Sequence, residues 1–301
     1  MQVMQGLREC AGVPSDPSRI MFNMNRLSIE RRAQILAMLT EGNSMRATAR
    51  MAGCSFNTVS KLLLDVGAAC TKFQDETLRE LHCTTMQCDE IWSFVGSKAK
   101  NVPDDRKDEF GVGDVWCWVA IDADSKLVPS WLLGERKTAD CIAFLDDLRG
   151  RLRYRIQLST DAHASYKGAV GLVFASDVDW AQVIKEYKPT NIAPGRYSPP
   201  ACTGVRVKPQ LGNPDLAKTS TSYIERQNLT MRMNMRRYTR LTNAFSKKLE
   251  SHAAAVALHF MAYNFARPHK TLASPYPRTP AMAAGVADHV WALQEIAALL
   301  D

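Results

Sequence analysis

The stretch CTTMQCDEIWSFV, residues 83–95, is an apolar, β-forming run with two acids, Asp89 and Glu90, near its centre. Threonine, isoleucine, tryptophan, phenylalanine and valine favour extended chain, so the run predicts a strand. A carboxylate in such a strand is costly unless it is paired or bound to a metal. Neighbouring strand residues point to opposite faces, so we expect only one of these two acids to enter a given site. A buried carboxylate held by backbone N–H groups or by an arginine is the alternative.

The residues around this strand predict a mixed α/β domain. Two further β-like runs flank a hairpin turn at 122–126. After them, strands and amphipathic helices alternate. In chain order the expected elements are strands 83–95, 114–122 and 126–133, helix 138–152, strand 155–160, helix 163–174, strand 179–187 and helices 219–240, 243–266 and 286–300. Residues 188–217 are rich in proline and glycine, which predicts an insertion loop.

Two more acids follow elements of this pattern. Asp161 comes directly after the apolar run RIQLST, at the expected end of a strand, where sites of α/β sheets often lie. It could equally cap the helix that follows. Glu225 begins a basic helical stretch, on which Arg232 and Arg236 fall within about 20° of its direction. The alternative for Glu225 is a salt bridge with Arg226 or with a neighbouring turn.

The N-terminal third predicts helices. Ser28 is an expected N-cap, and Ala49, Gly53 and Val59 have the spacing of a helix-turn-helix, in which glycine makes the turn. Ser55 would cap the recognition helix. Side chains expected to face DNA are Phe56, Asn57, Thr58 and Lys61 in the major groove and Arg46 and Arg50 at phosphates. An ordinary small helical bundle is the alternative.

Charge and composition favour a polyanion partner. The net charge of the 301 residues is +7, and it is unevenly distributed. Residues 205–248, around Glu225, hold 10 lysines and arginines against 2 acids, a net of +8. The eight cysteines have no metal-ligand spacing, which predicts reduced thiols in a cytosolic protein. No signal-peptide pattern and no apolar run of about 18 residues is found, so we expect a soluble protein.

Four segments are similar to the catalytic core of insertion-sequence-one family DDE transposases. They are QCDEIWSF (87–94), GDVWCWVAIDADSKLVPSWL (113–132), LSTDAHASY (158–166) and TSYIERQNLTMRMNMRRYTRLTNAFSKK (221–248). The resemblance covers roughly residues 24–300 and implies an RNase H-like fold that cuts and joins DNA ends with Mg²⁺ or Mn²⁺. Asp89, Asp161 and Glu225 fall on the family's three acid positions. Oxygen ligands suit these ions, and two of them about 3.5–4 Å apart clamp the attacking and leaving oxygens of an in-line displacement.

The sequence therefore predicts a transposase that acts on double-stranded DNA as a homo-oligomer in a bacterial cytoplasm, at the nucleoid. Its parts would be a weakly structured extension (1–23), a helix-turn-helix domain (24–80), a catalytic domain (83–270) that includes the 188–217 loop, and a C-terminal loop and helix (271–301). Expected DNA contacts of the basic stretch are Arg232, Arg236 and Arg237. The alternatives are a metal-dependent nuclease or resolvase and a non-catalytic helix-turn-helix repressor.

Overall fold

The computed structural model describes residues 26–301 except 108, 110, 189–200 and 240–241, and in this part six strands form one sheet. Their order across the sheet is β3-β2-β1-β4-β5-β6. The first three strands are antiparallel, β4 and β5 run parallel to β1, and β6 runs antiparallel to β5. The strands are β1 (Thr85–Val95), β2 (Gly113–Asp122), β3 (Ser130–Gly134), β4 (Ile156–Asp161), β5 (Val178–Lys188) and β6 (Ala201–Leu211).

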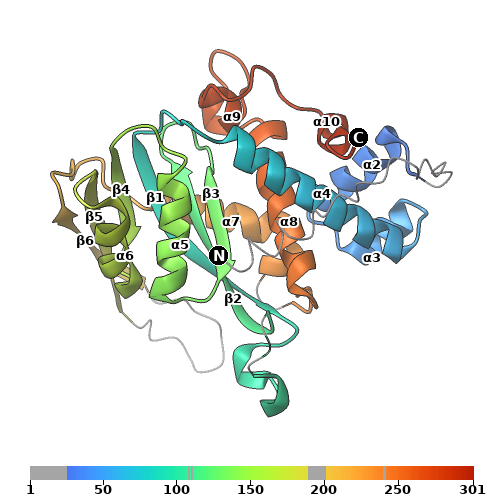
Figure 1. Cartoon of the computed structure of the whole chain (residues 1–301), viewed down its shortest axis with the longest axis horizontal. Coiled ribbons are helices and arrows are strands. Elements are labelled where there is room, and N and C mark those ends of the chain that lie inside the picture. The colour runs from blue at the N-terminus through green and yellow to red at the C-terminus, as the bar shows by residue number, and fades with distance from the viewer. Residues whose placement is uncertain (1–25, 108, 110, 189–200, 240–241) are drawn as a thin grey trace, which may run out of the picture.

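Helices cover both faces of this sheet. Helices α5 and α6 lie over one face, and α7 and α8 lie over the other (Figure 1). This arrangement is an RNase H-like mixed sheet flanked by helices, as the sequence predicts. The helices are α2 (Ile29–Thr40), α3 (Met45–Met51), α4 (Phe56–Thr77), α5 (Thr138–Arg149), α6 (Ala164–Phe174), α7 (Ser222–Asn234), α8 (Leu249–Met261), α9 (Pro280–Ala283) and α10 (Leu293–Ala298).

Alternation along β1 explains why the sheet is covered twice. Cys88 belongs to the hydrophobic cluster that contains Phe144 of α5 and Tyr166 of α6. Ile91, three residues on, belongs to a second cluster with Ile224 of α7. Because successive strand side chains point to opposite faces, one apolar strand needs a cover on each side.

The expected loop at 188–217 is wrong in its second half. Residues 201–211 form β6, which pairs with β5 at the edge of the sheet. The proline and glycine content argued for a loop, but Pro209 is compatible with a strand at an edge. Residues 189–200 lie outside the described residues, as does the expected extension at 1–23.

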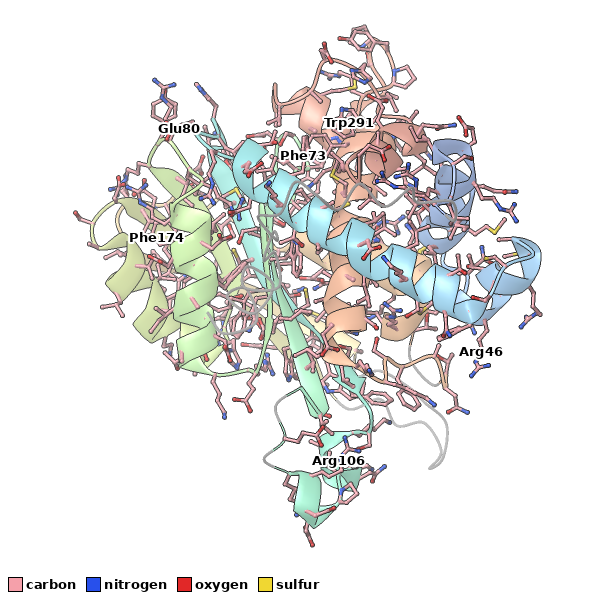
Figure 2. All side chains as sticks on the ribbon, turned by 45° about the vertical axis from the view of Figure 1, so that its right-hand side comes forward. Arg46, Phe73, Glu80, Arg106, Phe174 and Trp291 are labelled. Carbon is pink, nitrogen blue, oxygen red and sulfur yellow. The ribbon has the colours of Figure 1, made fainter. Side chains whose placement is uncertain are left out.

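Three expected helices are shorter than their patterns, and one of them, expected over 243–266, begins only at Leu249. Helix α7 ends at Asn234 rather than at residue 240, because the chain turns there and buries Tyr238 in the core. Near the C-terminus only Leu293–Ala298 is helical, not 286–300. There Trp291 lies beside Phe73 (Figure 2), with ring centroids 4.9 Å apart. It also packs against Phe265, with ring centroids 5.3 Å apart. Its backbone N–H also donates to Phe265 O, so tertiary packing prevails over helical periodicity.

The N-terminal helices begin where the sequence predicts. The hydroxyls of Ser28 and Ser55 accept backbone hydrogen bonds as N-caps, and Gly53 has a positive φ of 56° in the turn between α3 and α4. Helix α4 crosses α8 so closely that a Cβ added at Gly67 would lie 2.5 Å from Ala254 Cα. The larger hydrophobic cluster runs from α2 through the sheet, so the core does not divide at residues 80–83. The domain boundaries stay a prediction.

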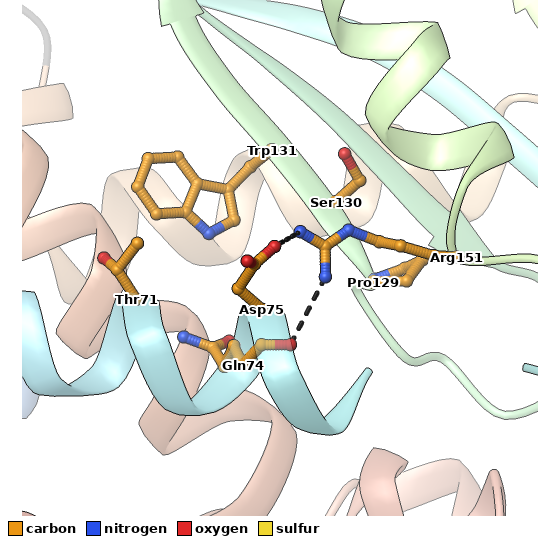
Figure 3. Close-up of a pocket in the computed structure, with 7 residues that line it drawn as sticks. All are labelled: Thr71, Gln74, Asp75, Pro129, Ser130, Trp131 and Arg151. Atoms are coloured by element: carbon orange, nitrogen blue, oxygen red, sulfur yellow. Dashed lines mark hydrogen bonds and ion pairs between the residues drawn. The ribbon is translucent and has the colours of Figure 1, made fainter. Parts of the chain in front are cut away.

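Arg151 joins α4 to the sheet domain. Its guanidinium donates to the carboxylate of Asp75 and to the backbone carbonyl of Gln74 in α4 (Figure 3). It also donates to the carboxylate of Asp147 and to the carbonyl of Leu78 at the end of α4. The cavity beside it has a volume of about 20 Å³, which is room for little more than one water. We therefore regard this place as a structural joint. None of the described helices is long and apolar enough to cross a bilayer.

Candidate active site

Three carboxylates converge where β1 and β4 lie side by side. The two strands are parallel neighbours with Cys88 opposite Thr160, so the next residues along each strand, Asp89 and Asp161, come close together. One carboxylate oxygen from each of Asp89, Glu90 and Asp161 lies within 4.8 Å of the other two. Residues 72 positions apart in the chain are thus brought into one cluster by strand register.

The expectation that only one of Asp89 and Glu90 could reach this place is wrong. The two side chains do lie on opposite sides of β1, Asp89 toward α7 and Glu90 toward α6. However, Asp161 is the last residue of β4, and its carboxylate lies within reach of both. The end of a strand lets opposite faces share a site, which alternation alone does not predict.

Glu90 is the most enclosed acid of the cluster. Its side chain is 0% exposed and forms an ion pair with Arg136 at 2.6 Å, and Tyr166 donates to it at 3.3 Å. Burial, followed by the charges of Asp161 and Asp89, raises the pKa of Glu90 to about 7, although Arg136 opposes the shift. Glu90 thus also has the structural role of a buried carboxylate held by an arginine.

The environment of Asp89 resists ionisation less strongly than that of Glu90 does. Burial and then the charge of Asp161 raise its pKa to about 6, and the charge of Glu225 adds to this effect. Two donors oppose the rise: Glu90 N–H donates to Asp89 Oδ1 at 2.8 Å, and Asn228 Nδ2 donates to Asp89 Oδ2 at 2.9 Å.

Glu225 lies beside the cluster rather than in it. It is on the first turn of α7, its side chain is 43% exposed, and it is not one of the three acids within 4.8 Å. Its carboxylate pairs with Lys185 of β5 and accepts a hydrogen bond from Thr221. The expected partner in a purely structural role, Arg226, is thus replaced by Lys185.

Sequence reasoning missed Asn228 and Lys185. Asn228 is three residues after Glu225, and side chains at this spacing share a helix face, so its closeness to the site was open to inference. Lys185 gave no such signal, because only the pairing of β5 in the sheet brings it to α7.

The segment after Asp161 settles an open alternative. Helix α6 begins at Ala164 with His163 at the N-cap position, so Asp161 is not its cap. Instead, Asp161 Oδ1 accepts the His163 backbone N–H at 2.9 Å. The His163 ring lies against the cluster, with Nδ1 3.9 Å from Glu90 Oε1, and burial lowers its pKa.

Most of the expected DNA-facing side chains at the N-terminal helices are accessible. Arg46, Arg50, Asn57 and Lys61 are exposed, whereas Thr58 is half-buried with its hydroxyl against Ser55. Figure 2 shows Arg46 at the far end of these helices from the sheet, and its guanidinium lies over Phe56 at 5.4 Å.

The expected basic stripe on α7 is wrong in part. Arg232 is on the helix, but Arg236 follows the helix end and does not continue its face. The Arg237 guanidinium turns inward, where it donates to Ser251 O and to Met45 Sδ, and burial lowers its pKa to about 10. These contacts engage the Arg237 guanidinium within the protein, and its expected contact with DNA stays a prediction.

No protein-family model and no curated protein matches the chain. Among solved structures, it is similar to the Mos1 strand transfer complex at 16% identity, covering 57% of this chain and 62% of that one with a TM-score of 0.21. A pre-cleavage Mos1 transpososome is 14% identical, with 52% of this chain and 59% of that one covered and a TM-score of 0.21. The Mos1 mariner paired end complex with Mn is 15% identical, with 57% of this chain and 64% of that one covered and a TM-score of 0.20. The chain spans about three fifths of the solved chains that it matches.

Proposed function

We propose that this chain is a DDE transposase that cuts and joins DNA ends by metal-dependent phosphoryl transfer, as its resemblance to the insertion-sequence-one family implies. The observation on which this depends is the convergence of Asp89, Glu90 and Asp161 within 4.8 Å, where the end of β4 meets β1 in an RNase H-like sheet. Glu225 stands on the adjacent helix, close enough for its charge to raise the pKa of Asp89.

The donor set fits a divalent cation of the hard, oxygen-binding type. Burial, followed by the repulsion between close carboxylates, raises the pKa of Asp89 and of Glu90, and a cation between them would favour the ionised forms. Asp89 and Asp161 would hold Mg²⁺ or Mn²⁺, with Glu225 completing the site. When bound, such ions lower the pKa of water and stabilise a leaving oxygen.

The residues around the acids have supporting roles. Arg136 forms an ion pair with Glu90. In the described contacts, Asp89 and Asp161 accept hydrogen bonds but form no ion pair with an arginine. Asn228 holds the Asp89 carboxylate in one orientation. Lys185 pairs with Glu225, so this carboxylate would have to leave the lysine before it completed a metal site.

A strand-transfer assay on pre-cleaved element ends tests the proposal. With Mg²⁺ we expect joined product, and with EDTA none. Asp89→Asn, Asp161→Asn and Glu225→Gln should each lower the rate by at least about a hundredfold while end binding persists. The matched control is Asp104→Asn, which removes an acid whose side chain is 93% exposed on the arm between β1 and β2. Unchanged joining in the Glu225→Gln protein would remove Glu225 from the mechanism.

The same assay separates the alternatives. Hydrolysis of the ends without joined product would indicate a metal-dependent nuclease or resolvase. Specific binding with neither cleavage nor joining, at any concentration of Mg²⁺ or Mn²⁺, would indicate a repressor.

We further propose that α3 and α4 bind the double-stranded ends of the element, and that the chain acts as a homo-oligomer on DNA. Arg46→Ala and Arg50→Ala should weaken all duplexes alike and should each reduce the salt dependence of binding by about one unit. Asn57→Ala should instead reduce the preference for the element's own ends. Equal loss on every duplex in the Asn57 variant would contradict its expected contact with bases.

A further inference from the structure

Aromatic side chains continue along β1 and β2 from the acid cluster. Trp92 and Trp116 stand directly opposite each other in the antiparallel pair, so they share one face of the sheet. Glu90, Trp92 and Phe94 alternate along β1 and therefore lie on that same face. Phe94 is four residue steps beyond Glu90 along the strand, which is about 13 Å. We name Trp92, Phe94, Trp116 and Phe245 the aromatic row.

Ring contacts and cations hold the aromatic row together. The Trp92 and Phe94 rings are 5.7 Å apart, and the Phe94 and Phe245 rings are 4.9 Å apart with planes at 30°. Lys98 Nζ lies 5.8 Å from the Trp92 ring and 5.9 Å from the Phe94 ring. The members of the row are half-buried, so part of each remains open to solvent.

Arg136 connects the aromatic row to the acid cluster. Its guanidinium lies 4.7 Å over the Trp116 ring and forms the 2.6 Å ion pair with Glu90. The row and Glu90 therefore lie on the α6 side of β1, and Asp161, at the end of β4, is the acid of the cluster within reach of both sides. Lys98 and Arg136 give the row a positive charge at both ends.

A purely packing role would predict that α5 and α6 cover these rings, as they cover Trp118 on the same strand pair. Trp118 is fully buried, whereas Trp92 and Trp116 are not. One acid, Asp114, is exposed on this face, and its carboxylate accepts a hydrogen bond from the Ala99 backbone N–H. Partly exposed aromatic rings combined with cations are an arrangement that binds single-stranded nucleic acid, because every base has a face to stack.

We propose that the aromatic row stacks unpaired bases of the DNA strand whose backbone lies at the acid cluster. This inference rests on the proposed function, and it specifies the substrate as an end with splayed or single-stranded nucleotides. Bases within an intact duplex are stacked on one another, so only unpaired bases would present their faces to Trp92 and Trp116. Lys98 and Arg136 would lie beside the phosphates of these nucleotides.

Binding in EDTA tests the inference without catalysis. The probes are a duplex with three unpaired nucleotides at its end, the same DNA with abasic residues at those three positions, and a blunt duplex. We expect wild-type protein to bind the unpaired bases about tenfold or more tightly than the abasic residues, as loss of a base–aromatic stack implies. Equal affinity for these two probes would overturn the inference, and this comparison needs no variant.

Variants then assign the effect to the aromatic row. Trp92→Leu and Trp116→Leu should remove the preference for bases and leave blunt-duplex binding unchanged, and Trp92→Phe should keep part of it. The matched control is Tyr154→Leu, an exposed ring that lies 5.5 Å from the Arg153 guanidinium but outside the row. A preference for bases that survives in both tryptophan variants would overturn the assignment to the row. Joining of blunt ends by a protein without any preference for bases would sink this inference and leave the proposed function standing.

Discussion

The side chain of Asn228 donates a hydrogen bond from Nδ2 to Asp89 Oδ2 at 2.9 Å, which ties helix α7 to strand β1 at an acid of the proposed site. Asn228 is only 4% exposed, and Glu225 stands one turn earlier on the same helix. The bond therefore orients Asp89 and also determines how far Glu225 lies from it.

We expect Asn228→Ala to lower strand-transfer activity about tenfold or more, because a hydrogen bond to a charged group is worth about 1.5–3 kcal/mol. The Mg²⁺ concentration that gives half-maximal rate should rise, since the Asp89 carboxylate loses its fixed orientation. Asn243→Ala, at an exposed asparagine, is the control. A normal rate and an unchanged Mg²⁺ requirement in Asn228→Ala would exclude a positioning role.

Asp89→Asn should stabilise the protein in EDTA at neutral pH. The pKa of Asp89 is about 6 in the folded chain against 3.8 as the ordinary value, so the folded chain holds more protons between these values. The free energy of unfolding therefore falls as pH rises from about 4 to about 6, by up to about 3 kcal/mol.

Urea unfolding at pH 4 and pH 7 checks this prediction. The variant should be more stable than wild type at pH 7 and nearly equal at pH 4, and added Mg²⁺ should raise the stability of wild type alone. If Asp89→Asn is less stable than wild type at both pH values, ionisation of Asp89 does not destabilise the folded chain.

His252 should make the fold sensitive to acid. Its ring is buried among the hydroxyls of Ser93, Tyr238 and Ser246, and burial, with the charge of Arg237, lowers its pKa to about 3. The unfolded chain takes up a proton near pH 6.5 and the folded chain does not, so stability is complete above that pH and falls as pH decreases toward 3.

Replacing this histidine measures its share. His252→Gln should lower the slope of unfolding free energy against pH by up to about 1.4 kcal/mol per pH unit between pH 6 and 4. His82→Gln, at an exposed ring, is the matched control. Identical slopes in wild type and His252→Gln would show that His252 is protonated equally in both states.

Gly67→Ala should destabilise the protein although alanine favours helices by about 1 kcal/mol over glycine. The added Cβ would lie 2.5 Å from Cα and Cβ of Ala254, so α4 would have to move away from α8. Gly171→Ala in α6 is the matched control, since its Cβ would meet nothing within 4 Å and it should gain stability. Thermal unfolding compares the two, and a gain at both positions would contradict the close helix crossing.

Local pattern was sufficient for the elements whose signals are local. Ser28 and Ser55 cap the helices that they precede, because a cap depends on the next three residues of the same chain. Likewise, the apolar run around Asp89 is a strand, and two strands, a helix, a strand, a helix and a strand follow in the predicted order.

Where a long-range contact competes with the local pattern, the prediction was wrong. Pro209 marked a loop, yet β5 offers the chain an edge to pair with. Helical periodicity continues beyond Asn234, but the helix ends there because Tyr238 is buried in the core. The pattern over 286–300 is helical only from Leu293, because Trp291 packs against Phe73. Periodicity records what a segment can form alone, whereas burial depends on partners elsewhere in the chain.

The sequence by itself determined that acids would stand in a strand, at a strand end and on a basic helix. Only the tertiary structure decided which of them meet. It placed Glu90 against Asp89 and Asp161, set Glu225 beside them with Lys185, and supplied Asn228 as the connection. The reason is that a site is made by the register between strands and the docking of a helix, and both are properties of pairs of segments that neither segment encodes alone.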